Sequence, residues 1–513
     1  MRLSELVTHL PDATLQGHGS DPEITSASYD SRSVSPSSIF IAVAGFKADG
    51  HDFLRQAVRA GAAAVAVQAD GGGTWSSILN ESRTPALIIP DTRQALARIA
   101  AALAGYPARG LHTIGVTGTD GKTSVSDLLH HMLSSAGERT GLISTAECRV
   151  GDRLLADTGR MTTPEAPEVQ QMLREMVSDG CRWSVIEATS HGLALHRVDE
   201  CDFDIAVFTN LYADHLDFHG THKEYVDAKG RLFTMLDSTT QKGIEKTAVL
   251  NADDPASGEF RRLTRAQVIE YGLNAAADVR ADQIAPDGWS SGFLVHAFGT
   301  EREISMQVPG DFNVYSGLAA YAVAHAGGLD PDAAVRAIES WRGAPGRMEL
   351  IEEGQPFTVL VDFAHAPESL RRVLTFMRER SAGRIIAVFG CIGERDRDRR
   401  FGMGRVAAEC ADYTIVTDDN PYSEDRNAII AEIVGGLRAG GRREGHDYGV
   451  IPYRREAIAH ALSMAVDGDV VLLAGKGHER EVHLPDAVYS CHDPTVAREV
   501  LEELGYVGRR EGM

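Results

Sequence analysis

Short apolar runs alternate with helix-like stretches through the middle and last parts of the chain. The runs that resemble buried strands are His112 to Thr117, Val185 to Glu187, Ile205 to Thr209, Ala248 to Asn251, Ile385 to Gly390, Thr414 to Thr417 and Val470 to Ala474. Buried strands separated by helices indicate parallel sheets built from βαβ units. Ligands bind at the carboxyl ends of the strands in such sheets, so the residues after each run are the first candidates for function.

Two clusters of glycine and proline divide the chain. Asp91 can cap a helix from Thr92 to Ala104, which Gly105 to Gly110 would end. A second helical stretch, Asp332 to Trp341, runs into the breakers Gly343 to Gly346. We therefore predict three domains, at residues 1–107, 108–343 and 344–513. The first domain carries strand-like runs at Ile39 to Val43 and Ala63 to Val67, so we expect it to be α/β as well.

Composition narrows the class of protein. The chain has 513 residues, of which 43% are hydrophobic and 24% are charged, as in globular proteins and unlike disordered or fibrous ones. The 51 Lys and Arg against 73 Asp and Glu give a net charge of −22. Such a charge repels phosphate backbones and anionic lipid, so we do not expect nucleic acid as a partner.

Targeting signals and cysteine pairs are also missing from the sequence. No stretch approaches the roughly 18 apolar residues of a membrane span, and the start lacks the pattern of an export signal. The six cysteines are scattered and form no CxxC pair, so neither a zinc knuckle nor a disulfide framework is indicated. We expect a protein of the reducing cytoplasm with no membrane insertion.

A glycine-rich segment, Gly115 to Ser124, follows the first strand of the middle domain and opens a helix. Strand, glycine loop and helix in this order suit phosphate binding, because backbone N–H groups and the helix N-terminus face the anion. Lys122 would neutralise the β- and γ-phosphates, and Thr123 would hold Mg²⁺ through its hydroxyl. The strict GxxxxGK[ST] pattern fails because Val116 stands where its first glycine should be, so the loop is a variant.

Acidic and basic side chains follow other strands of this domain. Glu187 ends a strand, where a carboxylate that holds Mg²⁺ would lie. His215, His219 and His222 have a spacing that could also suit zinc, but Asp217 and Gly220 favour a loop, and no cysteine is close. Lys229, taken by itself, is a surface lysine or a partner of phosphate.

Three polar loops follow strands of the last domain. A run of arginines, Arg395 to Arg400, comes after one strand and can be a solvated face or a clamp for carboxylates. The segments Thr417 to Asp425 and Ala474 to Arg480 follow two further strands. Because strand ends of one sheet meet at one edge, we expect these loops to form a binding site.

These motifs together resemble the Mur ligase family, most closely the UDP-N-acetylmuramoyl-tripeptide synthetases of the MurE type. The matching segments are YDSRSV, FIAVAGFKADGHDF, GVTGTDGKTS, TTPE, EATSHGLALHRV, FTNLYADHLDFHG, YVDAKGRLF, NADDP, FNVYSGLAA, PGRMEL, VDFAHAPESL, GERDRD, DDNPYSED and GKGHE. The resemblance implies a small N-terminal α/β domain, a central P-loop ATPase domain with a mostly parallel sheet, and a C-terminal Rossmann-like domain. The first domain would bind the UDP end of the substrate, the second ATP, and the third the incoming amino acid.

The resemblance also implies a reaction and its site residues. ATP would activate UDP-N-acetylmuramoyl-L-alanyl-D-glutamate as an acyl phosphate, which an amino acid attacks. The implied catalytic residues are Lys122, Glu187, His215 and Lys229. Two Mg²⁺ ions would be held by Thr123, Glu187, His215 and Lys229, the last carrying a carbamate derived from CO₂. The implied ATP-binding residues are Gly118, Thr119, Asp120, Gly121, Lys122, Thr123, Ser124, Asn313, Arg347, Asp362 and His365. Those for the UDP-muramoyl dipeptide are Ser31, Thr162, Thr163, Thr189 and Arg197, and those for the amino acid are Arg395, Asp419, Asn420, Tyr422, Gly475 and Glu479.

The chain departs from the family pattern at four positions. Ser316 stands where the second adenine-contacting Asn is common, Met161 where Asn is frequent, and Leu195 where Gln is often found. The family's motif for meso-diaminopimelate is DNPR, and here Tyr422 replaces the arginine that would bind the distal carboxylate. We therefore expect L-lysine or L-ornithine as the amino acid, with Glu424, Asp425 and Glu479 as candidates to face its side-chain ammonium.

Three alternatives remain open at this stage, and we expect a monomer in each. The first is the same reaction with meso-diaminopimelate. The second is a ligase like folylpolyglutamate synthetase. That family, however, lacks the N-terminal domain that in this chain carries Asp30, Ser31 and Arg32. The third is a nucleotide-binding protein that has lost its chemistry, although the joint presence of Lys122, Glu187, His215 and Lys229 speaks against it.

Overall fold

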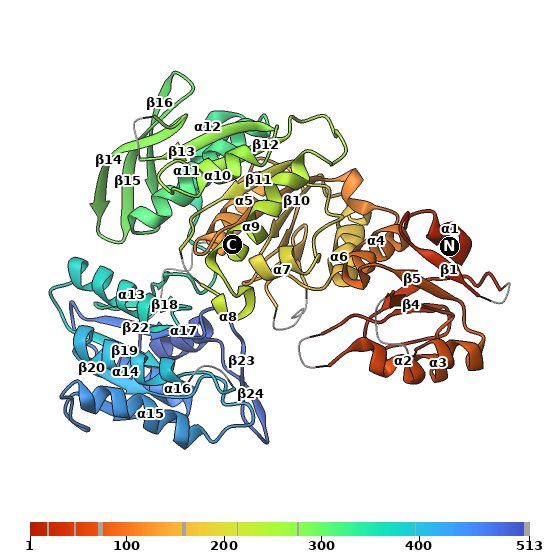
Figure 1. Ribbon diagram of the computed structural model, residues 1–513. Helices are drawn as coiled ribbons and strands as arrows, with labels where there is room; N and C mark the ends of the chain where they lie inside the picture. Colours follow the sequence, from red (N-terminus) through yellow and green to blue (C-terminus); the bar gives the residue numbers. More distant parts are fainter. Residues whose placement is uncertain are drawn as a thin grey trace. The chain divides into compact units, whose positions relative to one another are not determined.

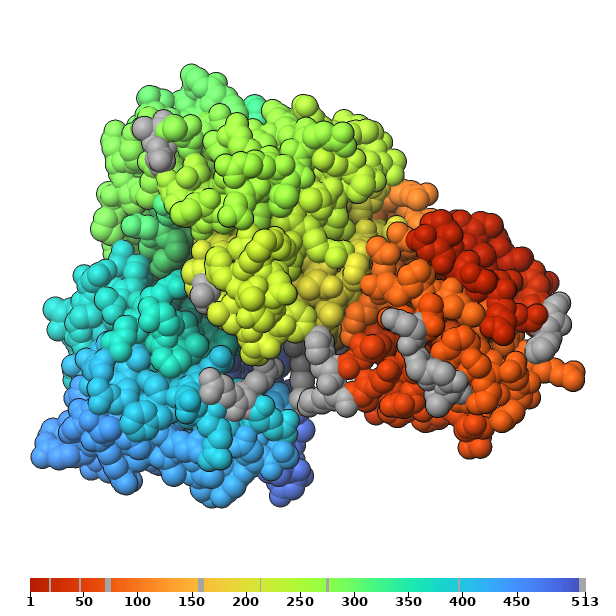
Figure 2. Space-filling view, in the orientation of Figure 1, coloured from red at the N-terminus to blue at the C-terminus, as the bar shows by residue number. Residues whose placement is uncertain are grey.

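The computed structural model describes residues 1–17, 20–45, 48–69, 75–155, 161–212, 214–273, 276–394 and 397–506, which are coloured in Figure 2. The chain divides into two units by its internal contacts. The first unit holds residues 1–284, 292–305 and 312–340. The second holds residues 285–291 and 306–311 together with the chain from Trp341 onward.

The N-terminal part of the first unit is built on a five-stranded sheet in the order β1-β5-β4-β3-β2, with β1 antiparallel and the others parallel. Successive residues of β3 point to opposite faces, so Ile39 and Ile41 join one apolar cluster and Phe40 joins the other. Its elements are α1 Leu3–Val7, β1 Thr14–Gln16, β2 Ser26–Ser28, β3 Ser38–Ile41, α2 Leu54–Arg59, β4 Ala64–Gln68, α3 Trp75–Ser82, β5 Ala86–Ile89 and α4 Thr92–Ala104, with 3₁₀ turns Gly50–Phe53 and Pro107–Gly110.

An eleven-stranded sheet follows, in the order β16-β15-β14-β13-β12-β11-β6-β10-β7-β8-β9. Strands β12, β11, β6, β10 and β7 at its centre are parallel. The elements are β6 His112–Thr117, α5 Lys122–Ser135, β7 Thr140–Ile143, β8 Cys148–Val150, β9 Arg153–Leu154, α6 Ala166–Ser178, β10 Trp183–Glu187, α7 Ser190–Ala194, β11 Ile205–Phe208, α8 Leu216–His219, α9 His222–Leu236, β12 Thr247–Asn251, α10 Ser257–Arg262, β13 Gln267–Gly272, β14 Val279–Asp287, β15 Ser290–Ala297, β16 Thr300–Met306, α11 Asp311–Ala326 and α12 Pro331–Ser340.

The second unit has a six-stranded sheet in the order β17-β18-β22-β19-β20-β21, parallel except for β17. Helices α13 to α15 supply one apolar cluster and α16 and α17 the other, so both faces are covered (Figure 1). The elements are β17 Glu349–Ile351, β18 Thr358–Asp362, α13 Pro367–Arg380, β19 Ile385–Phe389, α14 Asp398–Cys410, β20 Tyr413–Val416, α15 Arg426–Ala439, β21 Tyr448–Val450, α16 Arg454–Met464, β22 Val470–Ala474, β23 Glu481–His483, β24 Val488–Ser490 and α17 Asp493–Glu503.

The predicted α/β fold with its mostly parallel sheets is confirmed. Asp91 caps α4 by accepting the N–H groups of Arg93 and Gln94, and Gly105 ends the helix with a φ of +82°, as predicted. The expected loop around Asp217 is wrong, because Leu216–His219 form one helical turn that Gly220 ends. Among the helices of the described ranges, none has the length and apolar character needed to cross a membrane.

Candidate active site

The site in the first unit forms where three adjacent parallel strands end. Strand β6 lies between β10 and β11, with Val116 opposite Glu187 and Thr117 opposite Phe208. The segments that follow these strands therefore emerge side by side at one edge of the sheet. This is the edge at which the sequence predicts ligand binding.

The glycine loop after β6 is held tightly against the residues that follow β11. A Cβ on Gly118 would lie 1.8 Å from Thr209 Oγ1, so only glycine fits there. The N–H groups of Thr119 and Asp120 donate to the backbone and side-chain oxygens of Asn210, at 2.8 and 2.9 Å. Because these two amides are already bonded, the N–H groups that can meet an anion are those of the first turn of α5.

Two lysine side chains meet at the carbonyl oxygen of Gly118. Lys122 Nζ donates to this oxygen at 3.1 Å and to Thr119 O at 2.8 Å. Lys229 on α9 donates to the same oxygen at 2.5 Å, although its side chain is almost fully buried. Burial lowers the pKa of Lys229 well below its usual value, and the positive charge of Lys122 lowers it further.

Glu187 joins the loop to two other segments. Thr123 Oγ1 donates to both carboxylate oxygens of Glu187, at 3.1 and 3.2 Å. Thr145, which follows β7, donates its N–H and its hydroxyl to Glu187 Oε2, at 2.9 and 3.0 Å. The carboxylate is therefore oriented by three donors at the end of its strand. A hydroxyl beside a carboxylate is a pair of hard oxygen ligands of the kind that suits Mg²⁺.

Three histidine rings gather beside the loop. His191 at the start of α7 lies 4.8 Å from His215 and 5.5 Å from His219, measured between ring centroids. Burial lowers the pKa of all three, that of His191 to about 4, which favours the neutral imidazole that can bind a metal. Within the described ranges, no three His, Cys, Asp or Glu side chains are arranged to hold a metal ion.

The residues expected to hold the muramoyl dipeptide lie close to Glu187, with one exception. Thr163 Oγ1 donates to Glu187 O at 2.7 Å and lies 3.0 Å from Thr189 Oγ1. Arg197 donates to Thr163 O at 3.0 Å, and Thr162 Oγ1 lies 2.9 Å from Thr145 Oγ1. The exception is Ser31, which is buried after β2 in the N-terminal sheet. Its neighbour Tyr29 donates to Glu168 on α6 at 3.0 Å, so the segment of Ser31 contacts the middle domain.

The expected nucleotide residues are divided between the two units. Asn313 is buried on α11 in the first unit, and the hydroxyl of Ser316 donates to Phe312 O at 3.2 Å, within its own helix. In the second unit, Arg347 lies 4.6 Å from the ring of Phe363, and the His365 ring lies 4.6 Å from the same ring.

Asp362 ends β18 beside these rings. Its two carboxylate oxygens accept the N–H groups of Met348 and Ala364, each at 2.9 Å. The carboxylate therefore joins the segment of Arg347 to that of His365, and the three residues expected to lie around the nucleotide form one cluster within the second unit.

The residues expected to bind the amino acid also meet in the second unit. Asp419 and Asn420 follow β20, and Gly475 and Glu479 follow β22. Asn420 Nδ2 donates to Glu479 Oε2 at 2.8 Å. Gly475 has a φ of +102°, and a Cβ there would lie 3.2 Å from Asp419 Oδ2. Arg395 lies outside the described residues.

The hypothesis that Glu424 and Asp425 face a substrate ammonium is not supported by their contacts. Glu424 binds the buried guanidinium of Arg400 through both oxygens, each at 2.9 Å, and accepts the N–H of Glu394. Asp425 caps α15 by accepting the N–H of Asn427 at 2.9 Å. Tyr422, in the left-handed region with a φ of +52°, packs its ring 5.6 Å from that of His483. Of the three carboxylates considered, only Glu479 lies against Asn420.

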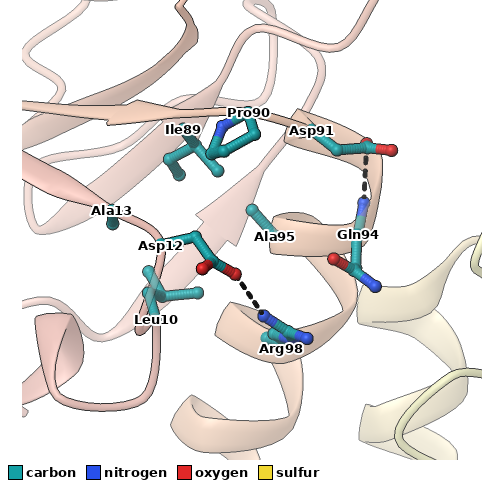
Figure 3. Close-up of a pocket in the computed structure, with 9 residues that line it drawn as sticks. All are labelled: Leu10, Asp12, Ala13, Ile89, Pro90, Asp91, Gln94, Ala95 and Arg98. Atoms are coloured by element: carbon teal, nitrogen blue, oxygen red, sulfur yellow. Dashed lines mark hydrogen bonds and ion pairs between the residues drawn. The ribbon is translucent and has the colours of Figure 1, made fainter.

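A small hollow lies in the N-terminal sheet region of the first unit. It is lined by Leu10, Asp12, Ala13, Ile89, Pro90, Asp91, Gln94, Ala95 and Arg98 (Figure 3). Asp91 accepts the N–H of Gln94 at 3.1 Å, and Asp12 pairs with Arg98 at 3.7 Å. Its volume of about 30 Å³ has room for about one water molecule. We assign it no function.

Sequence reasoning missed several residues that organise the site. Thr145 follows a strand without a recognisable motif, yet it orients Glu187. Tyr225 begins the YVDAKGRLF segment but no role was predicted for it, and its hydroxyl lies 2.9 Å from Thr119 Oγ1. Lys476 lies in the GKGHE segment that the sequence analysis identifies, but no role was predicted for it. Arg454 and Asp493 form a fully buried pair, and Arg454 also donates to Asp418 O and Ala474 O, at 3.0 and 2.8 Å. That pair fixes the two strand ends before Asp419 and Gly475.

The fold and these sites define an enzyme with a phosphate-binding loop in its central sheet and a separate Rossmann-like C-terminal domain. Family models match three consecutive segments: "Mur ligase family, catalytic domain" at residues 23–103, "Mur ligase middle domain" at 116–324 and "Mur ligase, glutamate ligase domain" at 346–477.

Individual proteins match over nearly the whole chain. The UDP-N-acetylmuramyl-tripeptide synthetase of Roseiflexus sp. (strain RS-1) is 43% identical, covering 99% of this chain and 100% of that protein. The UDP-N-acetylmuramoyl-L-alanyl-D-glutamate--2,6-diaminopimelate ligase of Geobacillus thermodenitrificans is 39% identical, covering 98% and 100%. A solved structure of a 2,6-diaminopimelate ligase superposes with a TM-score of 0.64 at 30% identity, covering 94% and 96%.

The chain belongs to the Mur ligase family. The resemblance seen in its sequence is confirmed, and the chain is an ATP-dependent ligase.

Proposed function

We propose that this ligase adds a diamino acid to the D-glutamate of UDP-N-acetylmuramoyl-L-alanyl-D-glutamate, in the cytoplasmic synthesis of peptidoglycan precursors. The names of its relatives support this substrate. The observation that carries the proposal is the convergence of Lys122, Thr123, Glu187 and Lys229 on the loop at Gly118. A ligase that must bring a triphosphate to a carboxylate needs cations and oxygen ligands at such a loop.

Each predicted domain has a part in the proposal, which assumes that the protein acts as a monomer. Residues 1–107 bind the UDP end through Ser31, and Thr162, Thr163, Thr189 and Arg197 bind the muramoyl dipeptide. Residues 108–343 bind ATP through the segment from Gly118 to Ser124 and through Asn313. Residues 344–513 bind the incoming amino acid, and they also contribute Arg347, Asp362 and His365 to the nucleotide.

The proposed reaction has two steps. An oxygen of the substrate's γ-carboxylate attacks the γ-phosphorus of ATP, the bond to the β-phosphate oxygen breaks, and ADP leaves. The neutral amine of the amino acid then attacks the acyl carbon, phosphate leaves with the bonding electron pair, and the amine loses a proton. Lys122 neutralises charge on the β- and γ-phosphates, while the first turn of α5 orients them with its N–H groups.

Thr123 and Glu187 fit a first Mg²⁺ because their oxygens already lie together and three donors fix the carboxylate. His215 and Lys229 are the residues proposed for a second ion. Mg²⁺, when bound, spreads the negative charge that otherwise keeps a triphosphate and a carboxylate apart. Two threonine hydroxyls, those of Thr123 and Thr145, hold Glu187 in the orientation this role needs.

Lys229 acts in this proposal as a carbamate. Three features support it: the side chain is buried, it lies beside the phosphate loop, and Lys122 shares its acceptor. A buried amine beside another cation is favoured in its neutral form, which is the form that adds CO₂. Carbamylation replaces a second positive charge with an anion that can bind a cation.

The amino acid that we favour is L-lysine or L-ornithine. Tyr422 has no charge to pair with a distal carboxylate, and Arg400, the buried arginine close by, is already bound to Glu424 and Glu432. Relatives are named both as tripeptide synthetases and as 2,6-diaminopimelate ligases, so meso-diaminopimelate is the alternative.

An amino-acid panel tests the proposal directly. We expect the purified protein to release phosphate from ATP only when both the UDP-muramoyl dipeptide and L-lysine or L-ornithine are present. A clear preference for meso-diaminopimelate would overturn the amino-acid assignment alone. Nucleotide binding without any turnover would instead favour a protein that has lost its chemistry, and turnover with a folate in place of the dipeptide would favour the folylpolyglutamate reaction.

A further inference from the structure

Lys476 is the only lysine of the chain after Lys246, since every later basic side chain besides histidine is an arginine. It belongs to the second unit, and its side chain is fully buried. A lysine head is a compact point charge with three donors, whereas the guanidinium of arginine is a wide planar fork. We propose that Lys476 is a positioning residue that fixes Asn420 and Glu479 and sets the charge of the amino-acid site. This inference rests on the proposed function.

The Lys476 ammonium is surrounded by the residues proposed to bind the amino acid. Its Nζ lies 2.7 Å from Glu479 Oε2, 3.3 Å from Asn420 Oδ1 and 3.7 Å from Asp419 Oδ1. A buried cation is stable only when it is paired and hydrogen-bonded. These three oxygens therefore hold Lys476 in place, and Lys476 holds them together.

Asn420 is oriented by the same contacts. Its Oδ1 accepts from Lys476 and from the N–H of His483 at 3.0 Å, so its Nδ2 must face the other way, toward Glu479 Oε2 at 2.8 Å. Both donors to Glu479 thus use Oε2. Among the described residues no hydrogen bond to Glu479 Oε1 is found, and the side chain is 31% exposed. Lys476 therefore leaves one carboxylate oxygen available to a ligand.

Charge determines which ligand group suits that oxygen. Among the described residues of this group, the two carboxylates of Asp419 and Glu479 face the single ammonium of Lys476, so the carboxylate charges exceed the cation placed between them by one. A side chain that ends in a single ammonium, as in L-lysine or L-ornithine, balances this excess. A diaminopimelate side chain brings an ammonium and a carboxylate, so it leaves the charge unbalanced, and Tyr422 offers no cation for its carboxylate.

The decisive variant is Lys476→Met, which keeps the length of the side chain and removes its charge. We expect the KM for L-lysine to rise about tenfold or more, the effect of losing one charge-assisted hydrogen bond. The KM values for ATP and for the UDP-muramoyl dipeptide should stay unchanged. Arg443→Met is the matched control, because Arg443 is exposed and its pairing with Asp447 lies outside the site.

A double-mutant cycle with Glu479→Gln separates positioning from general damage. If Lys476 acts through Glu479, the double variant should bind L-lysine no worse than Glu479→Gln alone. Lys476→Arg restores the charge but not the shape, so we expect the KM for L-lysine to stay raised in this variant as well. This second variant also serves if the methionine variant does not fold.

The outcomes distinguish this inference from the function on which it rests. A rise in all three KM values together, no change in any of them, or fully additive effects in the cycle would overturn the role of Lys476 while wild-type ligation still stands. Absence of ligation by the wild-type chain with every amino acid of the panel would overturn the proposed function and this inference with it.

Discussion

The amine of Lys229 donates to the backbone carbonyl of Gly118 at 2.5 Å, the closest approach of α9 to the phosphate loop among the hydrogen bonds described here. Lys122, at the start of α5, donates to the same carbonyl at 3.1 Å. Two ammonium groups at one oxygen repel each other, and burial disfavours the charge on Lys229 first. The position therefore favours the neutral form of Lys229.

Replacing Lys229 with alanine should abolish ligation, with a fall of more than about a hundredfold in kcat, because the group that we propose as a ligand of a metal ion is lost. Phosphate release and product formation measure this directly. Lys223→Ala on the same helix is the control, since Lys223 is exposed and pairs with Asp227 at 2.5 Å. Full activity of the Lys229 variant would show that the carbamate assignment is wrong.

Gly118→Ala should raise the KM for ATP by about tenfold or more, because its Cβ would lie 1.8 Å from Thr209 Oγ1 and push the loop away from the end of β11. Steady-state kinetics with ATP as the varied substrate tests this. Gly258→Ala in α10 is the control, because a Cβ there meets open space. A normal KM for ATP in Gly118→Ala would show that the loop does not need this close approach.

The sequence predicts the strand ends of the site well because its central strands are buried on both faces and are therefore rich in apolar residues. Thr117 and Glu187 end their strands as predicted. The one-turn helix Leu216–His219 was missed because a single turn is too short for a helical period to appear.

Partners distant in the chain were also beyond prediction. Glu424 has an ordinary local sequence, yet its carboxylate is held by Arg400, 24 positions away. Lys476 and Asn420 are 56 positions apart and meet only because β20 and β22 end at the same edge of one sheet. Which side chains meet there depends on packing that no single segment encodes.

Removing one member of the Arg454 and Asp493 pair should lower the free energy of unfolding by about 3–5 kcal/mol, because the remaining charge is buried without a partner. Denaturant unfolding of Arg454→Met and Asp493→Asn measures this, and the double variant should lose less than the sum of the two. Removing the exposed Arg443 from its pair with Asp447, as in Arg443→Met, should cost at most about 1 kcal/mol. Equal losses at both pairs would contradict the burial argument.

Acid should lower the free energy of unfolding of the second unit by protonating the carboxylate of Glu424. Hydrogen bonds from Arg400 lower the pKa of the Glu424 carboxyl from 4.5 to about 2. A carboxyl whose pKa is lower in the folded state stabilises the fold above its unfolded pKa and loses that effect as the pH falls toward its folded pKa. The wild-type protein should therefore exceed Glu424→Gln in stability by about 1 to 3 kcal/mol at neutral pH, the range for hydrogen bonds to charged groups.

That difference should shrink as the pH falls from 4.5 to about 2, as measured by denaturant unfolding of both proteins across this range. Comparing the two proteins removes the titration of other carboxyls, including Glu432, whose pKa is also lowered by its arginine partners. A difference that stays constant down to pH 2 would mean that the contribution of Glu424 to stability does not come from the pairing of its charged carboxylate with Arg400. The two segments that Glu424 and Arg400 join would then have to be held together by Glu432 and by packing alone.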